Sequence, residues 1–289
     1  MVVEPNPHAP LVGGDLEAAP QGVLVLVLHT QGSTPREAGA WMLVTPHAVH
    51  GTIGGGQLEW QLIQQARVVL QAHRHQPPTV SRHALGPSLG QCCGGVMYVQ
   101  WECIASPEQA QALQQRWRPA RWPITLFGGG HVGRALVQAL QPLPFAVHWV
   151  DSRDGVFPNP LPAWVHTEHS DPVQRAVADM PAHSLVLIMS FSHAEDLDVV
   201  QACLERQRHS ADIRWIGLIG SRTKWATFRH RLEARGLTPA ELDAVTCPIG
   251  LPGIEGKEPE VIAASVVAQL LQVCCRRSAS TASAVTPHS

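Results

Sequence analysis

The chain has 289 residues, of which 45% are hydrophobic and 15% are charged, and its formal net charge is −2 at pH 7. This length allows two ordinary domains with full cores. The near-neutral charge excludes the basic field that non-specific binding to nucleic acid or an anionic membrane needs. No apolar run approaches the roughly 18 residues of a membrane span, and the start of the chain lacks the pattern of a signal peptide. We therefore expect a cytoplasmic protein whose seven cysteines are not paired in structural disulfides.

The first part of the chain predicts a small domain of strands with one helix. Residues 1–20 are rich in Pro, Gly and Ala, and we expect them to be mobile. A continuous apolar run over 22–29 predicts a buried strand, and the polar loop Gly32–Ala40 follows it. In this loop Arg36 is either part of a surface turn or the charge of an anion-binding loop. Further strands are expected over 40–45, 48–53, 79–85 and 96–104.

Three successive glycines, Gly54, Gly55 and Gly56, precede an amphipathic helix expected over 57–72. Such a run lets backbone N–H groups turn inward to form a nest that binds an anion. The alternative is a tight turn that only needs positive φ angles. Glu59 falls in the first turn of the helix, where its charge interacts favourably with the helix dipole.

Gln91, Cys92 and Cys93 lie in a Gly-rich stretch, residues 86–95, between two predicted strands. Neighbours on an extended chain point to opposite faces, so both thiols face one site only if the glycines bend the backbone. A Gly-rich frame leaves thiols accessible and places N–H groups near sulfur, which lowers a thiol pKa. The alternative is one buried and one exposed cysteine without a function. The spacing is not that of a zinc site.

A G-x-G-x-x-G pattern, formed by Gly128, Gly130 and Gly133, follows a predicted strand and opens a predicted helix at His131. The first glycine permits a sharp turn, the second lets a phosphate approach the backbone, and the third lets the helix pack closely on the strand. The free N–H groups of the helix N-terminus favour an anion. Asp151 ends the next predicted strand, where a ribose-binding acid is expected.

The second half of the chain alternates apolar strands with amphipathic helices, which predicts a parallel sheet covered on both faces. Ligands of such sheets bind beyond the carboxyl ends of the strands. Arg222, which begins a helix after a glycine turn at one of these ends, is a second candidate anion contact. Strands are expected over 124–127, 146–150, 164–167, 184–189, 213–219 and 245–249, and helices from His131, Asp171, Glu195, Arg222, Thr238 and Pro259.

The fold class that follows is α/β, with a C-terminal Rossmann-type parallel sheet, helices on both of its faces, and a smaller N-terminal α+β domain. The expected divisions are a mobile N-terminus over 1–20, an N-terminal domain over 21–105, a linker helix over 106–121, a Rossmann-type domain over 122–273 and a disordered tail over 274–289.

Several of these motifs together resemble the XdhC/CoxI family, and they occur in the family's order. In the N-terminal part the resemblance is carried by Gly32–Arg36 with Gly39 and Ala40, Gly51–Glu59 and Gly86–Gly95. In the C-terminal part it is carried by Phe127–Gly133, Asp151–Arg153, Gly217–Arg222 with Lys224, and Cys247–Leu251. The match runs from about residue 20 to residue 272, with one local departure at Pro252–Pro259, where many members carry an Ile-Gly-Ala/Ser turn.

The resemblance implies an accessory protein, not an enzyme, that binds the molybdenum cofactor during its sulfuration and inserts it into xanthine dehydrogenase. The implied partners are the xanthine dehydrogenase apoenzyme, a cysteine desulfurase and a molybdenum cofactor biosynthesis protein, and a homo-oligomer is a further option. Cys92 and Cys93 are the candidate contacts of molybdenum, a soft metal that thiolates suit. The other candidate cofactor-binding residues are Arg36, Gly54, Gly55, Gly56, Gln91, Gly128, Gly130, His131, Gly133, Asp151 and Arg222.

A protein of another class also fits the glycine motif. An NAD(P)-dependent oxidoreductase would use Asp151 for the ribose of NAD, and a nucleotide-binding regulatory protein would use it without catalysis. Against the oxidoreductase, the sequence has a single tyrosine, Tyr98, and no strong base beside His193, which lies just past a strand end.

Overall fold

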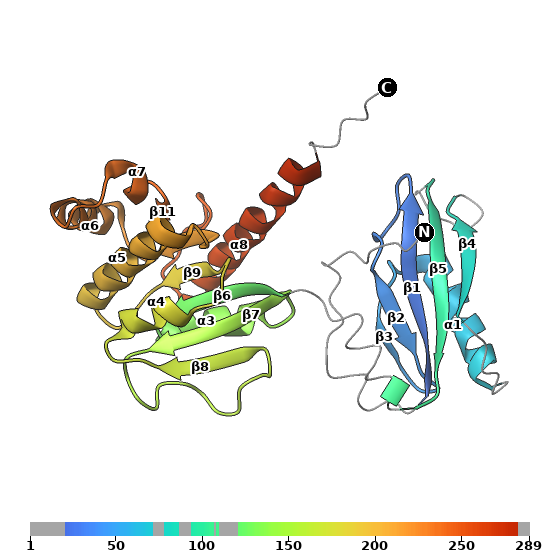
Figure 1. Cartoon of the computed structure of the whole chain (residues 1–289). Coiled ribbons are helices and arrows are strands. Elements are labelled where there is room, and N and C mark those ends of the chain that lie inside the picture. The colour runs from blue at the N-terminus through green and yellow to red at the C-terminus, as the bar shows by residue number, and fades with distance from the viewer. Residues whose placement is uncertain (1–20, 72–77, 87–93, 107, 110–120, 283–289) are drawn as a thin grey trace, which may run out of the picture. The chain divides into compact units, whose positions relative to one another are not determined.

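The computed structural model describes residues 21–71, 78–86, 94–106, 108–109 and 121–282, with side chains to residue 275. The chain divides between Ala120 and Arg121 into two compact units (Figure 1), which are described separately below.

The N-terminal unit is built on a five-stranded sheet in the order β3-β2-β1-β5-β4, in which all paired neighbours run antiparallel. The central strand β1 pairs along nearly its whole length with β5, from Gly22 opposite Ile104 to Gln31 opposite Val96. The strands are β1 (Gly22–Gln31), β2 (Trp41–Val44), β3 (Val49–Gly51), β4 (Thr79–Ala84) and β5 (Val96–Ile104).

Helix α1 (Gly56–Gln71) packs against one face of this sheet because its apolar residues recur on one side. Leu58, Leu62 and Ala66 are buried at helical spacing and join a core formed with alternate residues of β1, Val23 and Val25 among them. The unit therefore has the expected mixed architecture, one helix on an antiparallel sheet, and α1 begins directly at the glycine triplet.

The C-terminal unit is built on a six-stranded parallel sheet in the order β11-β10-β9-β6-β7-β8. Its first strand, β6, lies in the middle, between β7 on one side and β9 on the other. The order of the strands thus reverses beside β6, which is where ligands of such sheets bind. The strands are β6 (Trp122–Phe127), β7 (Phe145–Asp151), β8 (Val165–His169), β9 (Leu185–Ile188), β10 (Trp215–Leu218) and β11 (Val245–Thr246).

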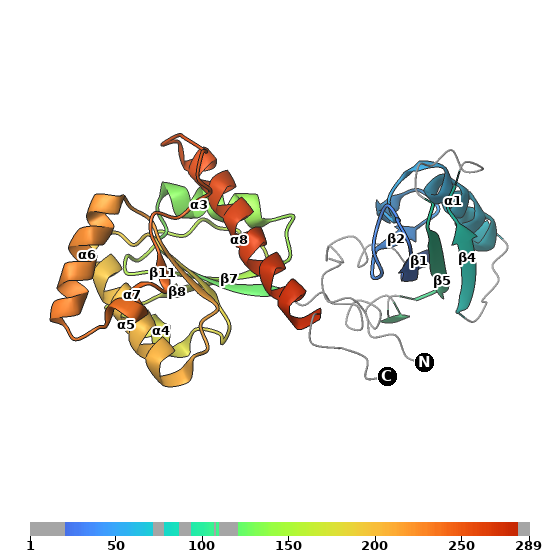
Figure 2. The same ribbon diagram turned by 90° about the horizontal axis from the view of Figure 1, so that it is seen from above.

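Helices cover both faces of the parallel sheet, as the sequence predicts (Figure 2). Helices α3 (His131–Leu140) and α8 (Pro259–Ala282) pack on one face, with Leu136 and Leu270 fully buried between helix and sheet. On the other face lie α4 (Ala176–Asp179), α5 (His193–Ser210) and α6 (Arg222–Ala234), with the short α7 (Pro239–Leu242) beside them. The fold class expected from the alternation of strands and helices is therefore confirmed.

Two elements differ from expectation. The helix expected from Asp171 is only a turn of 3₁₀ helix, Val173–Arg175, followed by the four residues of α4. It stops because Met180 precedes Pro181 and adopts an extended conformation, which is what a residue before proline prefers. Helix α8 runs beyond residue 273 to Ala282, since no glycine or proline interrupts the sequence between Pro259 and Pro287.

The buried face of α8 provides a test of its place in the core. Leu270→Ala removes a fully buried side chain of this helix, and we expect it to lower the free energy of unfolding by about 2–5 kcal/mol. Gln272→Ala, two residues away on the exposed side of the same helix, should change it by less than about 0.5 kcal/mol. Urea unfolding of the full chain measures both, and equal effects of the two variants would contradict the packing described.

Candidate functional site

The glycine turn after β6 has a distinct geometry at each of its three motif glycines. Gly128 has φ +119°, and a Cβ added there would lie 2.0 Å from the Met189 carbonyl oxygen. A Cβ added at Gly133 would lie 2.2 Å from the carbonyl oxygen of Gly128, so α3 approaches β6 closely. At Gly130 nothing lies within 4 Å of an added Cβ, and the residue is exposed. A side chain is thus sterically excluded at Gly128 and Gly133, whereas the space beside Gly130 is free.

Helix α3 begins at this exposed position, and no side chain in the described part of the protein caps it. Gly130 is its N-cap residue in an extended conformation, and the first hydrogen bond of the helix runs from the Arg134 N–H to the Gly130 carbonyl oxygen. By contrast, α5, α6 and α7 are each capped by a side-chain oxygen, those of Ser192, Ser221 and Thr238. The first N–H groups of α3, beginning at the exposed His131, therefore have no capping side chain among the described residues, and uncapped N–H groups of this kind are what an anion binds at a helix N-terminus.

Asp151 ends β7 next to the glycine turn, and its carboxylate is bonded within the protein. Its Oδ2 accepts from the Gly129 N–H at 2.6 Å and from Arg153 Nη2 at 2.9 Å. Its Oδ1 accepts from the Arg153 N–H at 2.8 Å and from Arg153 Nε at 2.9 Å. Burial alone would raise the pKa of Asp151, but the hydrogen bonds from Arg153 and Gly129 outweigh it and lower the pKa. The side chain is only 1% exposed.

Two cationic residues, Arg222 and Lys224, follow strand β10 in the first turn of α6. Of the two, only Lys224 is bonded to other residues that the structure describes. Lys224 Nζ donates to Asp196 Oδ2 at 2.6 Å and to the Ile219 carbonyl oxygen at 2.9 Å, which neutralises its charge. Arg222 is exposed, and its guanidinium forms no hydrogen bond with any described residue. It follows β10, two strands away from β6, or about 10 Å along the edge of the sheet.

A buried hydroxyl lies at the point where the strand order reverses. Ser190 follows β9, the neighbour of β6, and its N–H donates to Asp196 Oδ1 at 2.7 Å. Its Oγ is buried and has no hydrogen-bond partner among the residues that the structure describes. A buried polar atom without a partner is uncommon in folded proteins.

The glycine triplet of the N-terminal unit is already occupied by a carboxylate of the chain. Gly54, Gly55 and Gly56 all have positive φ angles, of 127°, 75° and 75°. Glu59 Oε2 accepts from the N–H groups of Ile53 at 2.9 Å and Gly55 at 3.1 Å, and from Thr52 Oγ1 at 2.5 Å. From the sequence we expect Glu59 only to interact with the helix dipole, because spacing alone does not show that its side chain reaches back over the turn.

Three motif segments of the N-terminal unit meet at one place. A Cβ added at Gly54 would lie 2.6 Å from Pro35 and 3.3 Å from Arg36 Cγ. The Gly95 N–H donates to the Ser33 carbonyl oxygen at 3.1 Å. Arg36 is exposed, and its guanidinium makes no hydrogen bond with the described part of the chain. Gln91, Cys92 and Cys93 lie outside the described residues, and their predicted roles stay predictions.

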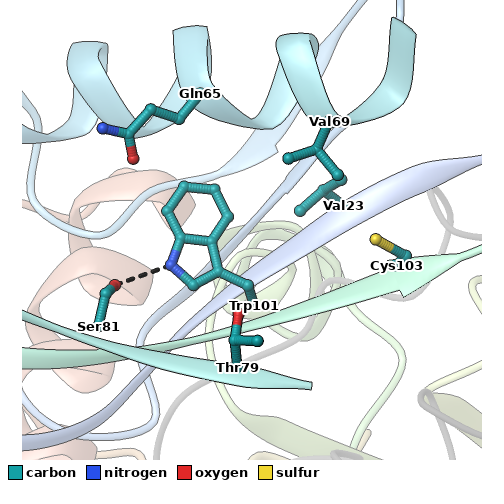
Figure 3. A pocket seen from close by; sticks show the side chains of 7 residues that line it. All are labelled: Val23, Gln65, Val69, Thr79, Ser81, Trp101 and Cys103. Carbon is teal, nitrogen blue, oxygen red and sulfur yellow. Dashed lines mark hydrogen bonds between the residues drawn. The ribbon is translucent and has the colours of Figure 1, made fainter. Parts of the chain in front are cut away.

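The N-terminal unit also contains a hollow between α1 and the sheet, with a volume of about 210 Å³ (Figure 3). The indole of Trp101 is held by a hydrogen bond from its Nε1 to Ser81 Oγ at 2.8 Å. Ser81 in turn contacts His83 Nε2 at 2.7 Å, and burial lowers the pKa of His83. The lining residues are Val23, Gln65, Val69, Thr79, Ser81, Trp101 and Cys103.

The described residues contain no group of three His, Cys, Asp or Glu side chains that could hold a metal ion. Their five cysteines form no disulfide, and burial raises the pKa of Cys247 and Cys274 to about 11. These two thiols are therefore poor nucleophiles at neutral pH. No described helix is both long and apolar enough to cross a bilayer.

The parallel sheet, the reversal of strand order beside β6 and the glycine turn before α3 define a Rossmann-type protein. Family comparisons are more specific. A model of the XdhC Rossmann domain matches residues 124–270, and a model of the XdhC and CoxI family matches residues 16–82. The chain belongs to the XdhC and CoxI family.

Two individual proteins illustrate the likeness. YqeB from Escherichia coli (strain K12) is 26% identical over 252 residues, which cover 86% of this chain but only 42% of YqeB. The chain thus spans less than half the length of this curated relative. A crystal structure of a xanthine dehydrogenase from Bacillus halodurans, so described, superposes with a TM-score of 0.70 at 21% identity. The superposed region covers 89% of this chain and 92% of the Bacillus halodurans chain, and the likeness shows a shared fold.

The carboxylate of Asp151 gives a pH-dependent test of the turn. Asp151→Asn removes the charge that binds Arg153 and the Gly129 N–H, so we expect a loss of about 1–3 kcal/mol in unfolding free energy at pH 7. The loss should fall toward the lower end because Arg153 is 37% exposed and can regain water.

The sign of the pH effect follows from the direction of the pKa shift. Because the folded-state pKa of Asp151 is lowered, its stabilisation is complete above the unfolded-state value of about 4 and is lost as pH falls through the folded-state value. The difference between wild type and Asp151→Asn should therefore shrink below about pH 4. Chemical denaturation at pH 7 and pH 3 measures it, and a constant difference would contradict the assignment.

Proposed function

We propose that this protein is a non-enzymatic accessory factor that binds the molybdenum cofactor as cargo and inserts it into the xanthine dehydrogenase apoenzyme. Membership of the XdhC and CoxI family supports this role. The observation that carries it is the uncapped N-terminus of α3 at Gly130, where a phosphate can approach the backbone.

The cargo and the residues are chemically compatible. The cofactor is a pterin dithiolene with a terminal phosphate and a soft metal. Free helix N–H groups and a position without a side chain suit the phosphate. Thiolates suit the metal, so we propose Cys92 and Cys93 as its contacts during sulfuration.

Of the two glycine turns predicted to hold the phosphate, the structure favours the one at Gly128–Gly133. The N–H groups of Ile53 and Gly55 already bind Glu59, so a phosphate at the other turn would have to displace a carboxylate. At the Gly128–Gly133 turn Asp151 accepts from the Gly129 N–H, but no described side chain caps the first N–H groups of α3. The unpaired guanidinium of Arg222 and the buried Oγ of Ser190 lie on the same edge of the sheet and add polar contacts for a ligand there.

The same proposal includes a cysteine desulfurase and a molybdenum cofactor biosynthesis protein as partners that supply sulfur and cargo. The oxidoreductase alternative is less well supported. The single tyrosine of the sequence, Tyr98, lies in β5 of the N-terminal unit. Asp151, which would bind the ribose of NAD, is bonded to Arg153.

Gly130→Asp tests the phosphate site with a variant that should be slightly more stable than the wild type. An aspartate at the N-cap of α3 would accept from its free N–H groups and stabilise the protein by a few tenths to about 1 kcal/mol. The same carboxylate would occupy the phosphate position and repel the ligand. We expect at least a tenfold weaker affinity for molybdenum cofactor, measured by anaerobic equilibrium binding, and a matching loss of apoenzyme reconstitution.

Gly130→Ala is the matched control, because a methyl group there meets no atom within 4 Å and brings no charge. It should retain most of the binding. A stable Gly130→Asp variant that binds and delivers the cofactor as well as wild type would refute the proposed site. NAD-linked hydride transfer by the wild type would instead support the oxidoreductase.

A further inference from the structure

The glycine turn matches a dinucleotide fingerprint, but the acid of that fingerprint has no acceptor position left. A carboxylate offers about four lone pairs for hydrogen bonds. Each oxygen of Asp151 accepts two hydrogen bonds from within the protein, four in total, and three of the donors belong to Arg153. A ribose diol, which would donate to this carboxylate, therefore has nowhere to bind.

Two of these four bonds depend on the Arg153 side chain alone. Its Nε and Nη2 take one lone pair on each oxygen, in the paired geometry typical of arginine and carboxylate. The other two bonds come from backbone N–H groups and would survive any substitution at residue 153 other than proline. Removing the side chain would thus free one position on each oxygen, which suits the two adjacent hydroxyls of a ribose.

The segment after β7 also packs against the glycine turn. A Cβ added at Gly129 would lie 2.8 Å from Val156 Cγ1, and Arg134 of α3 donates to the Val156 carbonyl oxygen at 2.8 Å. In a dinucleotide-binding domain the adenosine half lies beside the acid at this end of the sheet. Here the chain's own Arg153 and Val156 lie beside the turn.

A second set of contacts joins the segments that follow β7 and β9. Ser152 Oγ donates to Glu195 Oε1 at 2.7 Å, and the guanidinium of Arg153 lies 4.5 Å from the centre of the Phe191 ring. Because β6 lies between β7 and β9 in the sheet, these contacts cross over its carboxyl end. Arg153 therefore both pairs with Asp151 and contacts Phe191 of the segment after β9.

We propose that Arg153 determines the specificity of the turn: its pairing with Asp151 excludes ribose-containing dinucleotides and leaves α3 to ligands that bind through a terminal phosphate. The inference rests on the proposed function for the identity of the phosphate ligand, but not for the exclusion of NAD. It also separates this turn from the dinucleotide sites that share its glycine spacing.

The test is calorimetric titration of the full chain with NAD and with NADP. Wild type should bind neither measurably at millimolar concentration. Arg153→Ala should gain affinity for NAD by at least tenfold, because two acceptor positions of Asp151 become free. It should not gain affinity for NADP, whose 2′-phosphate would be repelled by the same carboxylate.

Two further variants distinguish the effect of the Arg153–Asp151 pairing from that of the Arg153–Phe191 contact, and from a failure to fold. Phe191→Ala removes the ring beneath the guanidinium but leaves the pairing with Asp151, so it should not gain NAD binding. Arg153→Lys keeps a cation that reaches only one oxygen, so it should gain less than Arg153→Ala, and it carries the test if Arg153→Ala does not fold.

Micromolar NAD binding by wild type would overturn the inference, and so would an Arg153→Ala variant that is folded yet gains nothing. A gain with Phe191→Ala equal to that with Arg153→Ala would assign the exclusion to the crossing instead, and would also overturn it. Molybdenum cofactor binding is measured on each variant in parallel. Its retention in an Arg153→Ala variant without NAD affinity would reject the role of Arg153 while leaving the proposed function standing.

Discussion

A carboxylate bonded to the N–H groups of a glycine turn recurs in both units of this protein, and the geometry of the candidate sites depends on it. Glu59 binds the turn before α1, and Asp151 binds the turn before α3. Turns rich in glycine expose N–H groups that must find acceptors when they are buried. A carboxylate from the chain satisfies them and fixes the backbone without a ligand.

The two turns differ in what remains after this internal bonding. In the N-terminal unit, Glu59 accepts from the N–H groups of Ile53 and Gly55, and the Gly54 N–H donates to Thr52 Oγ1, so side chains of the chain itself bond the N–H groups of this turn. In the C-terminal unit, Asp151 takes only the N–H of Gly129, and the first N–H groups of α3 stay open at Gly130. The two turns therefore differ in which N–H groups a carboxylate of the chain reaches, and the proposed phosphate site rests on this difference.

Much of the fold could be predicted because it depends on local patterns. Alternating apolar strands and helices predicted the parallel sheet and its two covered faces, and the conformations of Gly128, Gly130 and Gly133 agree with the spacing of the motif. That the hydrogen-bond acceptor positions of Asp151 are filled from within the protein could not be predicted in the same way. Spacing identifies an acid at the end of β7, but only side-chain geometry shows that Arg153, two residues later, fills its acceptors. The roles of Cys92 and Cys93 remain predictions.

Side-chain hydrogen bonds link the segments that follow four neighbouring strands of the parallel sheet, β7, β6, β9 and β10. Asp151 joins the glycine turn to the segment after β7, Ser152 joins that segment to α5, and Asp196 joins the end of β9 to Lys224 of α6. These hydrogen bonds fix the conformation of this edge of the sheet before any ligand binds. If a phosphate binds there as proposed, these bonded side chains need no further ordering, and the conformational entropy lost on binding falls mainly on exposed contacts such as Arg222.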